Sequence, residues 1–329
     1  MFNILNNPPP LEEFVTPNHG IDVPSIYAIE ATAACDLQCP MCFRTTSQLP
    51  GKKPELFNLS LLDLMLDRGD FSGSSYIELQ MAGEPTIHPH LGYIIQFLQE
   101  RAGVMVGLST HGHNFKKPYK HDFTVGEMLM GLDALTVSVD SLNPTIYHQM
   151  RYPKHLPALL ANLDYLFELV TQATSPPLVE LQLVKATNVP GSGDLDALKE
   201  LIHRKKWEGV FHPRMIGDSF TEMRGDVEEG SLPRSADVCL NPFTSVNITQ
   251  DGKVVSCCYA FHDEPFNTYG DLWKNSLSEI WKGAAVSEMR ETQILGNAQG
   301  LCAKCPMPSP IFIHQRIVSR LVRRLKCRP

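Results

Sequence analysis

Three cysteines, Cys35, Cys39 and Cys42, stand at C-x3-C-x2-C spacing directly after an apolar run, and no other stretch constrains the chain as strongly. Thiolates this close together can hold three corners of one metal cluster, and soft sulfur ligands select zinc or iron–sulfur over hard cations. Structural zinc sites normally close with four ligands. A three-cysteine loop with no fourth cysteine nearby therefore favours a [4Fe–4S] cluster with one iron open to a small molecule.

This loop, placed after a first strand, resembles the signature of the radical S-adenosylmethionine (SAM) superfamily. In that family the methionine part of SAM chelates the open iron, and an electron from the cluster cleaves SAM to a 5′-deoxyadenosyl radical that abstracts hydrogen from the substrate. The resemblance implies that Cys35, Cys39 and Cys42 bind the cluster and that Met41 lies near the adenine. It also implies a reducing electron donor such as flavodoxin or ferredoxin.

The composition is that of a soluble globular protein: 329 residues, of which 43% are hydrophobic and 20% charged. No run of 18 apolar residues occurs, and residues 1–23 contain no Lys or Arg, so we expect no membrane span, no signal peptide and a cytoplasmic location. The formal net charge of −7 disfavours nucleic-acid binding, because phosphate contact needs a basic surface. Nine clustered cysteines then indicate metal ligands rather than disulfides.

Six apolar segments alternate with helical patterns in the first two thirds of the chain. This alternation predicts an α/β fold, a partial (β/α)6 TIM-like barrel with its site at the C-terminal ends of parallel strands, followed by a small cysteine-rich auxiliary-cluster domain. The expected strands are residues 25–34, 77–81, 104–109, 134–140, 179–185 and 210–215, and the expected helices are residues 58–67, 91–101, 125–131, 156–170 and 195–203.

Composition shifts divide the chain into five parts. They are an N-terminal arm (1–23), the barrel (24–216), a linker rich in glycine and acidic residues (217–235), the auxiliary-cluster domain (236–309) and a basic amphipathic C-terminal helix (310–329). The terminal helix could lie on an anionic membrane or bind an acidic partner. The favoured interpretation is that its apolar stripe packs on the acidic body of the protein.

Two segments at expected strand ends resemble cosubstrate-binding motifs of the family. The segment Ala82-Gly83-Glu84-Pro85 resembles GGEP, which implies that Gly83, Glu84 and Pro85 approach the amino group of SAM. Glycine allows close backbone approach to a ligand. The segment Thr110-His111-Gly112 stands where relatives often carry Thr-Asn-Gly, and indicates a loop near the site.

The end of the fourth expected strand resembles the segment from which relatives bind the ribose and the methionine carboxylate. The resemblance assigns these roles to Ser138, Asp140 and Arg151. A guanidinium suits a carboxylate, although an ordinary surface ion pair is the alternative for Arg151. Further candidates to line the substrate pocket, each of which could equally be a structural contact, are Gln80, Lys185 and Arg214.

A second set of cysteines, Cys239, Cys257, Cys302 and Cys305, can close a tetrahedral site, and the spacing alone leaves a zinc ribbon open. The region also resembles the SPASM/twitch auxiliary-cluster domain, through Tyr-Gly-Asp-Leu at 269–272, a helix over 277–281 and Met-Arg at 289–290. A full SPASM domain has seven cysteines. The resemblance therefore implies the shorter twitch-like version, with one auxiliary [4Fe–4S] cluster bound by these four, at a spacing similar to that of aminocyclitol dehydrogenases.

These features predict a radical SAM oxidoreductase that abstracts hydrogen from a polar small molecule, such as a sugar or aminocyclitol, with the auxiliary cluster accepting the second electron. One alternative is a maturase that crosslinks or epimerises a ribosomally made peptide; another is a non-catalytic iron–sulfur or zinc protein. Neighbouring strand residues point to opposite sides, so Cys258 is left over as a candidate catalytic hydrogen donor, or as a buried free thiol. Cys327 is interpreted as structural or incidental.

Overall fold

The computed structural model describes residues 22–40, 42, 55–120, 123–186, 189–216, 239–258, 267–303 and 305. Within these residues one sheet has the strand order β11-β10-β9-β1-β2-β3-β6-β7-β8, and two short strands form a separate ribbon. The strands of the large sheet are β1 (Ser25–Ile29), β2 (Tyr76–Leu79), β3 (Met105–Thr110), β6 (Ala134–Ser138), β7 (Leu178–Val184), β8 (Phe211–Ile216), β9 (Ser245–Ile248), β10 (Lys253–Val255) and β11 (Thr268–Asp271), and the ribbon consists of β4 (Pro118–Lys120) and β5 (Phe123–Thr124).

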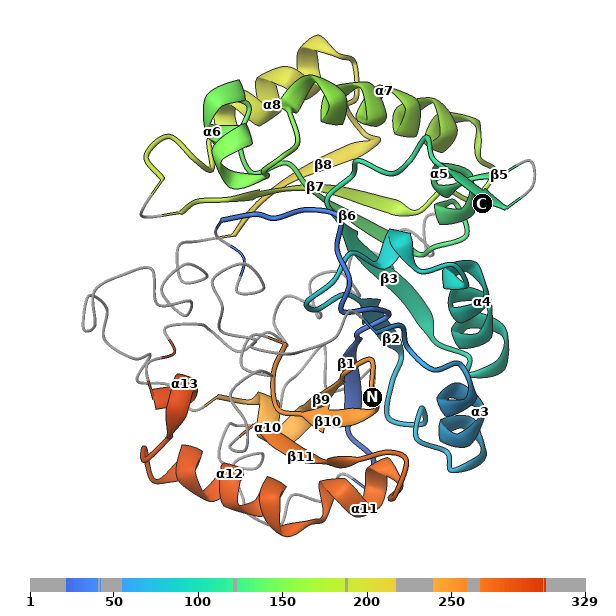
Figure 1. The fold of residues 1–329 in the computed structure, drawn as a ribbon, viewed down its shortest axis with the longest axis vertical. Helices are drawn as coiled ribbons and strands as arrows, with labels where there is room; N and C mark the ends of the chain where they lie inside the picture. Colours follow the sequence, from blue (N-terminus) through green and yellow to red (C-terminus); the bar gives the residue numbers. More distant parts are fainter. Residues whose placement is uncertain are drawn as a thin grey trace.

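The part of the sheet from β1 to β8 is the expected barrel. Strands β1, β2, β3, β6, β7 and β8 pair in parallel, each with its neighbour in the order above. The sheet is curved, and helices lie along its outer side (Figure 1). Alternate residues of β7, namely Val179, Leu181 and Leu183, are fully buried in the main hydrophobic core. The predicted partial (β/α)6 barrel is confirmed.

The helices of the outer layer have one apolar face. In α7, Leu159, Leu163 and Leu166 are spaced by four and three residues, so they share a face and are all fully buried in the main core. The helices of this half are α3 (Ser60–Asp67), α4 (Leu91–Gln96) with its π-helical continuation η2 (Phe97–Arg101), α5 (Val125–Leu129), α6 (Pro144–Met150), α7 (Leu156–Gln172) and α8 (Leu195–Arg204), together with the 3-10 turn η1 (Pro85–Ile87).

Strand β1 ends earlier than expected. The sequence predicted a strand over residues 25–34, but the ladder ends at Ile29. The following residues pair with a different segment, because Thr32 bridges Leu56 and the Phe57 N–H donates to the Ala31 carbonyl at 2.9 Å. The backbone therefore leaves the sheet before the cysteine loop begins.

The C-terminal part continues the same sheet. Strand β9 pairs in parallel with β1, with Ser245 opposite Ser25, and β10 and β11 follow in antiparallel pairing. The helices α10 (Asn241–Thr244), α11 (Leu277–Trp281), α12 (Ala284–Ile294) and α13 (Gly300–Ala303) belong to this part, with α11 and α12 along its outer side (Figure 1). A hairpin of β9 and β10 precedes Cys257, and the expected helix over 277–281 is present. The pairing of this hairpin with the barrel was not predicted.

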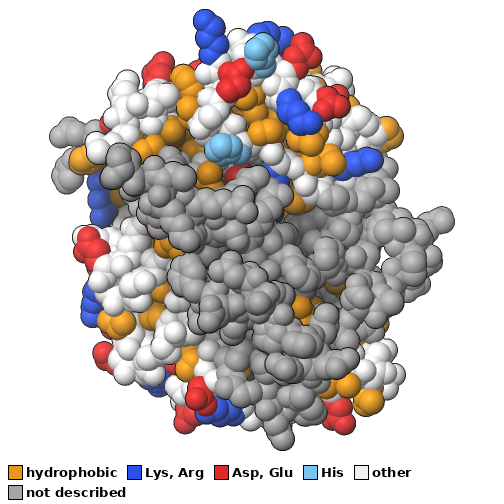
Figure 2. Space-filling view, turned by 180° about the vertical axis from the view of Figure 1, so that it is seen from behind, with side chains coloured by type: hydrophobic (Ala, Val, Ile, Leu, Met, Phe, Trp, Pro, Cys, Tyr) orange, Lys and Arg blue, Asp and Glu red, His pale blue; other side chains and the backbone are white. Residues whose placement is uncertain are grey.

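Several sequence predictions fall outside the described residues. They are most of the N-terminal arm, the linker at 217–235, the C-terminal helix at 310–329, Met41 and Cys327. The division into domains therefore stays a prediction. Among the described residues, no helix has the length and hydropathy needed to cross a bilayer. On the face shown in Figure 2, the described basic and acidic side chains are interspersed.

Candidate active site

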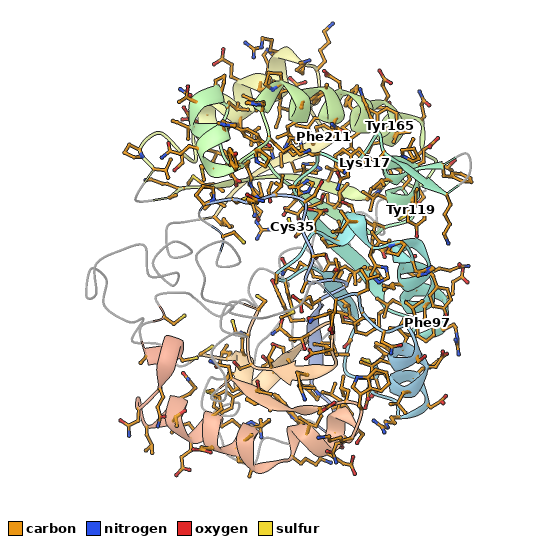
Figure 3. The ribbon with its side chains drawn as sticks, in the orientation of Figure 1. Cys35, Phe97, Lys117, Tyr119, Tyr165 and Phe211 are labelled. Carbon is orange, nitrogen blue, oxygen red and sulfur yellow. The ribbon has the colours of Figure 1, made fainter. Side chains whose placement is uncertain are left out.

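The cysteine loop lies at the C-terminal ends of the barrel strands. Cys39 is buried in a small apolar cluster, and the partly buried Cys35 and Cys42 pack against the same cluster. The Cys42 N–H donates to the Cys39 carbonyl at 2.9 Å, which closes the turn, and neither Cys35 nor its two companions form a disulfide. Figure 3 shows Cys35 on the inner side of the barrel, whereas Phe97 and Tyr165 lie in its outer layer. Three thiols on one loop, none of them in a disulfide, fit a three-ligand cluster.

Gly83 and Glu84 are held against this loop. A Cβ atom at residue 83 would lie 1.9 Å from the Thr32 carbonyl oxygen, so only glycine allows this approach. The Glu84 N–H donates to the Ala34 carbonyl at 2.8 Å, and the buried Glu84 carboxylate accepts from the Thr110 hydroxyl at 2.6 Å and the His111 N–H at 2.9 Å. The carboxylate is therefore fixed in place by the end of β3. Pro85 opens η1 directly behind it.

His111 links the same carboxylate to the residue after Cys35. Its Nδ1 accepts from the His113 N–H at 3.1 Å, so Nε2 carries the proton and donates to Asp36 at 2.8 Å. Burial opposes ionisation of Asp36, but hydrogen bonds from His111 and Lys117 outweigh it and hold the pKa of this carboxyl well below its usual range. Candidate ligand atoms of Cys35, Asp36 and His111 lie within 4.8 Å of one another. Because both ring nitrogens of His111 are engaged, we interpret this trio as a contact that positions the cluster loop.

Asp140 and Arg151 form a buried ion pair beside Cys39. Asp140 lies two residues after β6 in the left-handed conformation, with φ of 58°, and its Oδ2 accepts from Arg151 Nε. The other oxygen, Oδ1, has no hydrogen-bond partner among the described residues. Burial alone would lower the pKa of Arg151. The negative charges of Asp140 and Cys39 together raise it by more, so the net shift is upward. The surface ion pair considered for Arg151 is thus replaced by a buried one. Ser138 is partly exposed, two residues earlier on β6.

A histidine that the sequence did not single out lies next to this pair. His113 Nε2 lies 2.6 Å from the Tyr147 hydroxyl, inside the barrel end. Burial, followed by the nearby charges of His111, Lys154 and Arg151, lowers the pKa of His113 to about 3. Burial also raises the pKa of Tyr147. Both side chains are therefore neutral at physiological pH.

The inner face of the sheet carries a second polar group. Glu78 accepts from the Tyr76 hydroxyl and from Ser109 at 2.8 Å, and burial raises the pKa of Glu78. A Cβ atom at residue 107 would lie 1.6 Å from the Tyr76 hydroxyl, so Gly107 makes room for this pair. The period-two alternation in Tyr-Ile-Glu-Leu of β2 could have indicated these inward side chains.

The pocket candidates named from the sequence have different surroundings. Arg214 is buried and pairs with Glu180 at 3.1 Å. Gln80 is partly buried after β2, and Lys185 is exposed after β7. Of the three, Arg214 therefore belongs to the inner face of the barrel, beside Glu78. Its charge lowers the pKa of Glu78 and so opposes the effect of burial.

The second set of cysteines gathers around Tyr269. Cys302, Cys239 and Cys257 each add to the effect of burial, which raises the pKa of Tyr269 well above its usual value. The Tyr269 hydroxyl is buried and has no hydrogen-bond partner in the described part of the chain. The Cys305 N–H donates to the Cys302 carbonyl at 3.4 Å, which places the fourth cysteine on the same turn. Three thiols around a buried hydroxyl with no described partner fit an iron–sulfur cluster, whose sulfides would accept a hydrogen bond from that hydroxyl.

Cys258 packs against β1. It is 7% exposed and packs in a cluster with Tyr27 and Ala28 of β1, against which Cys257 and Met81 also pack. Tyr27 in turn lies close enough to Tyr76 to affect its pKa. The thiol of Cys258 is therefore buried next to the barrel interior.

Two family models match the chain. The radical SAM superfamily model matches residues 29–175, and the model of the SPASM iron–sulfur cluster-binding domain matches residues 239–306. The chain therefore contains a radical SAM domain followed by a SPASM domain. A radical SAM enzyme uses SAM and a [4Fe–4S] cluster, and a SPASM domain carries auxiliary iron–sulfur clusters.

Among curated proteins, GTP 3',8-cyclase of Vibrio vulnificus (strain YJ016) is 27% identical over 143 residues, which are 43% of this chain and 41% of that protein. The chain thus matches less than half the length of these curated relatives.

Solved structures of radical SAM enzymes share the fold. BtrN in complex with AdoMet and 2-DOIA is 13% identical, with a TM-score of 0.54 over 87% of this chain and 93% of BtrN. SuiB of Streptococcus suis, bound to precursor peptide SuiA, is 13% identical, with a TM-score of 0.56 over 82% of this chain and 66% of SuiB. The AdoMet-bound anSMEcpe is 15% identical, with a TM-score of 0.57 over 86% of this chain and 83% of anSMEcpe. At these identities the likeness is one of fold.

Proposed function

We propose that this radical SAM enzyme is an oxidoreductase that removes hydrogen from a polar small molecule, such as a sugar or aminocyclitol. The observation that carries the proposal is the polar inner face of the barrel. Ser109, Ser138 and Gln182 on that face are partly exposed, although they lie on central strands of the sheet. Hydroxyl and amide groups there suit a substrate with several hydroxyl groups.

The proposed cosubstrate site lies at the strand ends above this face. Cys35, Cys39 and Cys42 are the proposed ligands of one [4Fe–4S] cluster, which with SAM supplies the hydrogen-abstracting radical. Glu84, fixed by the hydroxyl and amide donors of the β3 end, is placed to accept from the amino group of SAM. Pro85 closes the turn behind it, and the partly buried Arg151 offers a guanidinium for the methionine carboxylate.

Asp140 and Ser138 are the proposed partners of the ribose hydroxyls. The unpartnered Oδ1 of Asp140 supports this assignment, because a buried oxygen normally has a donor. Met41 is proposed near the adenine on the resemblance alone. The four cysteines around Tyr269, namely Cys239, Cys257, Cys302 and Cys305, are proposed to bind one auxiliary [4Fe–4S] cluster. When a C–H bond and an O–H bond of the substrate are converted to a carbonyl, the C–H hydrogen would go to the 5′-deoxyadenosyl radical, the hydroxyl proton to solvent and the remaining electron to the auxiliary cluster. Reduced flavodoxin or ferredoxin would supply the electron for the first cluster.

Anaerobic reconstitution tests the two cysteine assignments. The wild-type protein is expected to hold about eight irons, as two [4Fe–4S] clusters, and to release 5′-deoxyadenosine from SAM when reduced. Replacing Cys35, Cys39 and Cys42 together by alanine should leave about four irons and abolish cleavage. Cleavage that persists in this variant, or a wild-type protein that holds only zinc, contradicts the proposal.

A peptide maturase is the second candidate. The fold likeness to SuiB, whose structure contains its precursor peptide, supports this alternative. Product mass separates the two: an oxidoreductase removes two hydrogens from a small molecule, whereas epimerisation leaves the mass of a peptide unchanged. In the second case the buried Cys258 is the candidate hydrogen donor, and Cys258→Ala should abolish inversion without changing the iron content.

A further inference from the structure

Glu30, directly after β1, is a buried carboxylate that joins two distant segments. It has no exposed surface, and its Oε1 accepts from the Ala82 N–H at 3.2 Å. Its Oε2 accepts from the Gln250 N–H at 3.1 Å. Ala82 begins the segment Ala82-Gly83-Glu84, and Gln250 lies in the turn between β9 and β10. One side chain thus connects the cosubstrate segment to the auxiliary hairpin, defined here as residues 245–255.

The segment Ala82-Gly83-Glu84 lies between the cluster loop and the auxiliary hairpin. On one side, the absence of a side chain at Gly83 lets the segment press on Thr32, as described above. On the other side, Ala82 and Val255 of β10 form a small buried apolar cluster. Because the segment is in contact with both neighbours, it cannot shift unless one of them also moves. Its position therefore depends on both neighbours.

We propose that Glu30 is a positioning residue through which the auxiliary hairpin sets the affinity of the cosubstrate segment for SAM. A carboxylate suits this place because its two oxygens accept from two amide donors that face it from opposite segments. Each amide is buried, so each needs its acceptor. When the hairpin is well packed, Glu30 holds Ala82-Gly83-Glu84 in the position that presents Glu84. When the hairpin loosens, that constraint is lost. The inference rests on the proposed role of Glu84.

Asp70 provides a matched control. It is also a buried carboxylate that joins the barrel to the auxiliary region, since its Oδ1 accepts from the Leu277 N–H at the start of α11 at 2.8 Å. Asp70 follows α3 and has no hydrogen bond to the cosubstrate segment in the described part of the chain. Loss of Asp70 should therefore weaken the joint between the two regions without moving Ala82.

The first experiment compares Glu30→Gln with Asp70→Asn in anaerobically reconstituted protein. Glutamine keeps the size of Glu30 but turns an N–H₂ group toward one of the two amides, so one link is lost. We expect the Kd of SAM in Glu30→Gln to rise roughly tenfold, with iron content and the rate of cleavage at saturating SAM within about twofold of wild type. Asp70→Asn should leave the Kd within about twofold. An unchanged Kd in Glu30→Gln, or an equal rise in both variants, overturns the proposal.

Hydrogen exchange gives a readout that does not depend on SAM. In Glu30→Gln, whichever of the amides of residues 82 and 250 faces the new N–H₂ group should exchange faster, while the Glu84 amide, which donates to Ala34, should keep its protection. Faster exchange throughout the protein would indicate general destabilisation and would contradict a positioning role.

A double-mutant cycle tests the coupling itself. Gly252 has φ of 86° in the β9–β10 turn, so Gly252→Ala strains the turn that carries Gln250. This substitution should raise the Kd of SAM in the Glu30 background and have little further effect beside Glu30→Gln. Additive effects would overturn the coupling.

The Glu84→Gln variant separates failure of this inference from failure of the proposed function. If neither Glu84→Gln nor Glu30→Gln changes the Kd of SAM, the proposed cosubstrate site fails. If Glu84→Gln weakens SAM binding and Glu30→Gln does not, only the coupling fails.

Discussion

The two cysteine sites have different surroundings. The first comes from one short loop and lies among charged side chains, including the Asp140–Arg151 pair and Asp36. The second comes from cysteines far apart in the sequence. Its described neighbours include the buried Tyr269, Arg290, whose charge acts on Tyr269, and Asn267, whose Oδ1 accepts from Cys302 Sγ at 3.5 Å. Carboxylate and guanidinium groups suit the recognition of a charged small molecule, whereas burial and hydrogen bonds near sulfur tune an electron carrier. The difference supports the proposal of a cosubstrate site at the first loop and a redox site at the second.

The largest expected effect separates these two tasks. Replacing Cys302 and Cys305 together by alanine should remove about four irons and abolish substrate oxidation, while SAM cleavage persists. The measurements are iron content, 5′-deoxyadenosine release and product mass. If SAM cleavage is lost to the same degree as in the triple alanine variant of the first loop, the two sites do not have separate tasks.

The buried ion pair gives the next largest effect. Arg151→Ala leaves Asp140 buried without its partner, so the free energy of unfolding should fall by about 3–5 kcal/mol. Adding Asp140→Asn removes the uncompensated charge and should restore part of that loss. Urea unfolding of the variants measures both changes. A double variant no more stable than Arg151→Ala alone would show that the Asp140 charge does not cause the loss.

The depressed pKa of His113 predicts a pH dependence. Its folded pKa of about 3 lies below the unfolded value near 6.5, so its contribution to stability is complete above about pH 6.5 and is lost as pH falls toward 3. Over that interval His113→Gln should reduce the slope of unfolding free energy against pH by about 1.4 kcal/mol per pH unit. His203 is exposed and serves as the control position. Equal slopes in wild type and His113→Gln would contradict the shift.

The smallest effect concerns the second set of cysteines, around Tyr269. If the orphaned Tyr269 hydroxyl donates to the auxiliary cluster, Tyr269→Phe should lower the midpoint potential of that cluster by about 20–60 mV. The potential of the cluster in the first loop should not change. A redox titration followed by electron paramagnetic resonance distinguishes the two clusters. A shift in both potentials, or in neither, would remove Tyr269 from the redox site.

The sequence predicted most of the barrel because its signals are local. Strands such as β7 are continuous apolar runs, and α7 repeats its leucines at helical spacing. Helix α6 was missed because it is short, although Asn143 caps it and Pro144 opens it. Helix α12 was also missed: its buried face includes Arg290 and Gln293, so it lacks an apolar stripe.

The cosubstrate motifs could be found in the sequence, but their contacts could not. Gly83 and Arg151 were predicted from motif resemblance. The roles of Glu30 and Asp36 depend on partners up to 220 residues away, as between Glu30 and Gln250, and no local pattern reports such pairs. The period-two alternation in β2 is a local signal for the inward Glu78, whereas the cosubstrate motifs lie at the strand ends.

The parallel pairing of β9 with β1 has a consequence for how the chain is made. Ser25 lies opposite Ser245, so 245 − 25 = 220 residues separate the partners. A ribosome adding 5–20 residues per second needs roughly 10–40 s to supply the second strand after the first. During that time one edge of β1 has no permanent neighbour, and an uncovered strand edge pairs readily with other chains. Synthesis rate and chaperone supply should therefore affect the yield of this protein more than its final stability would suggest.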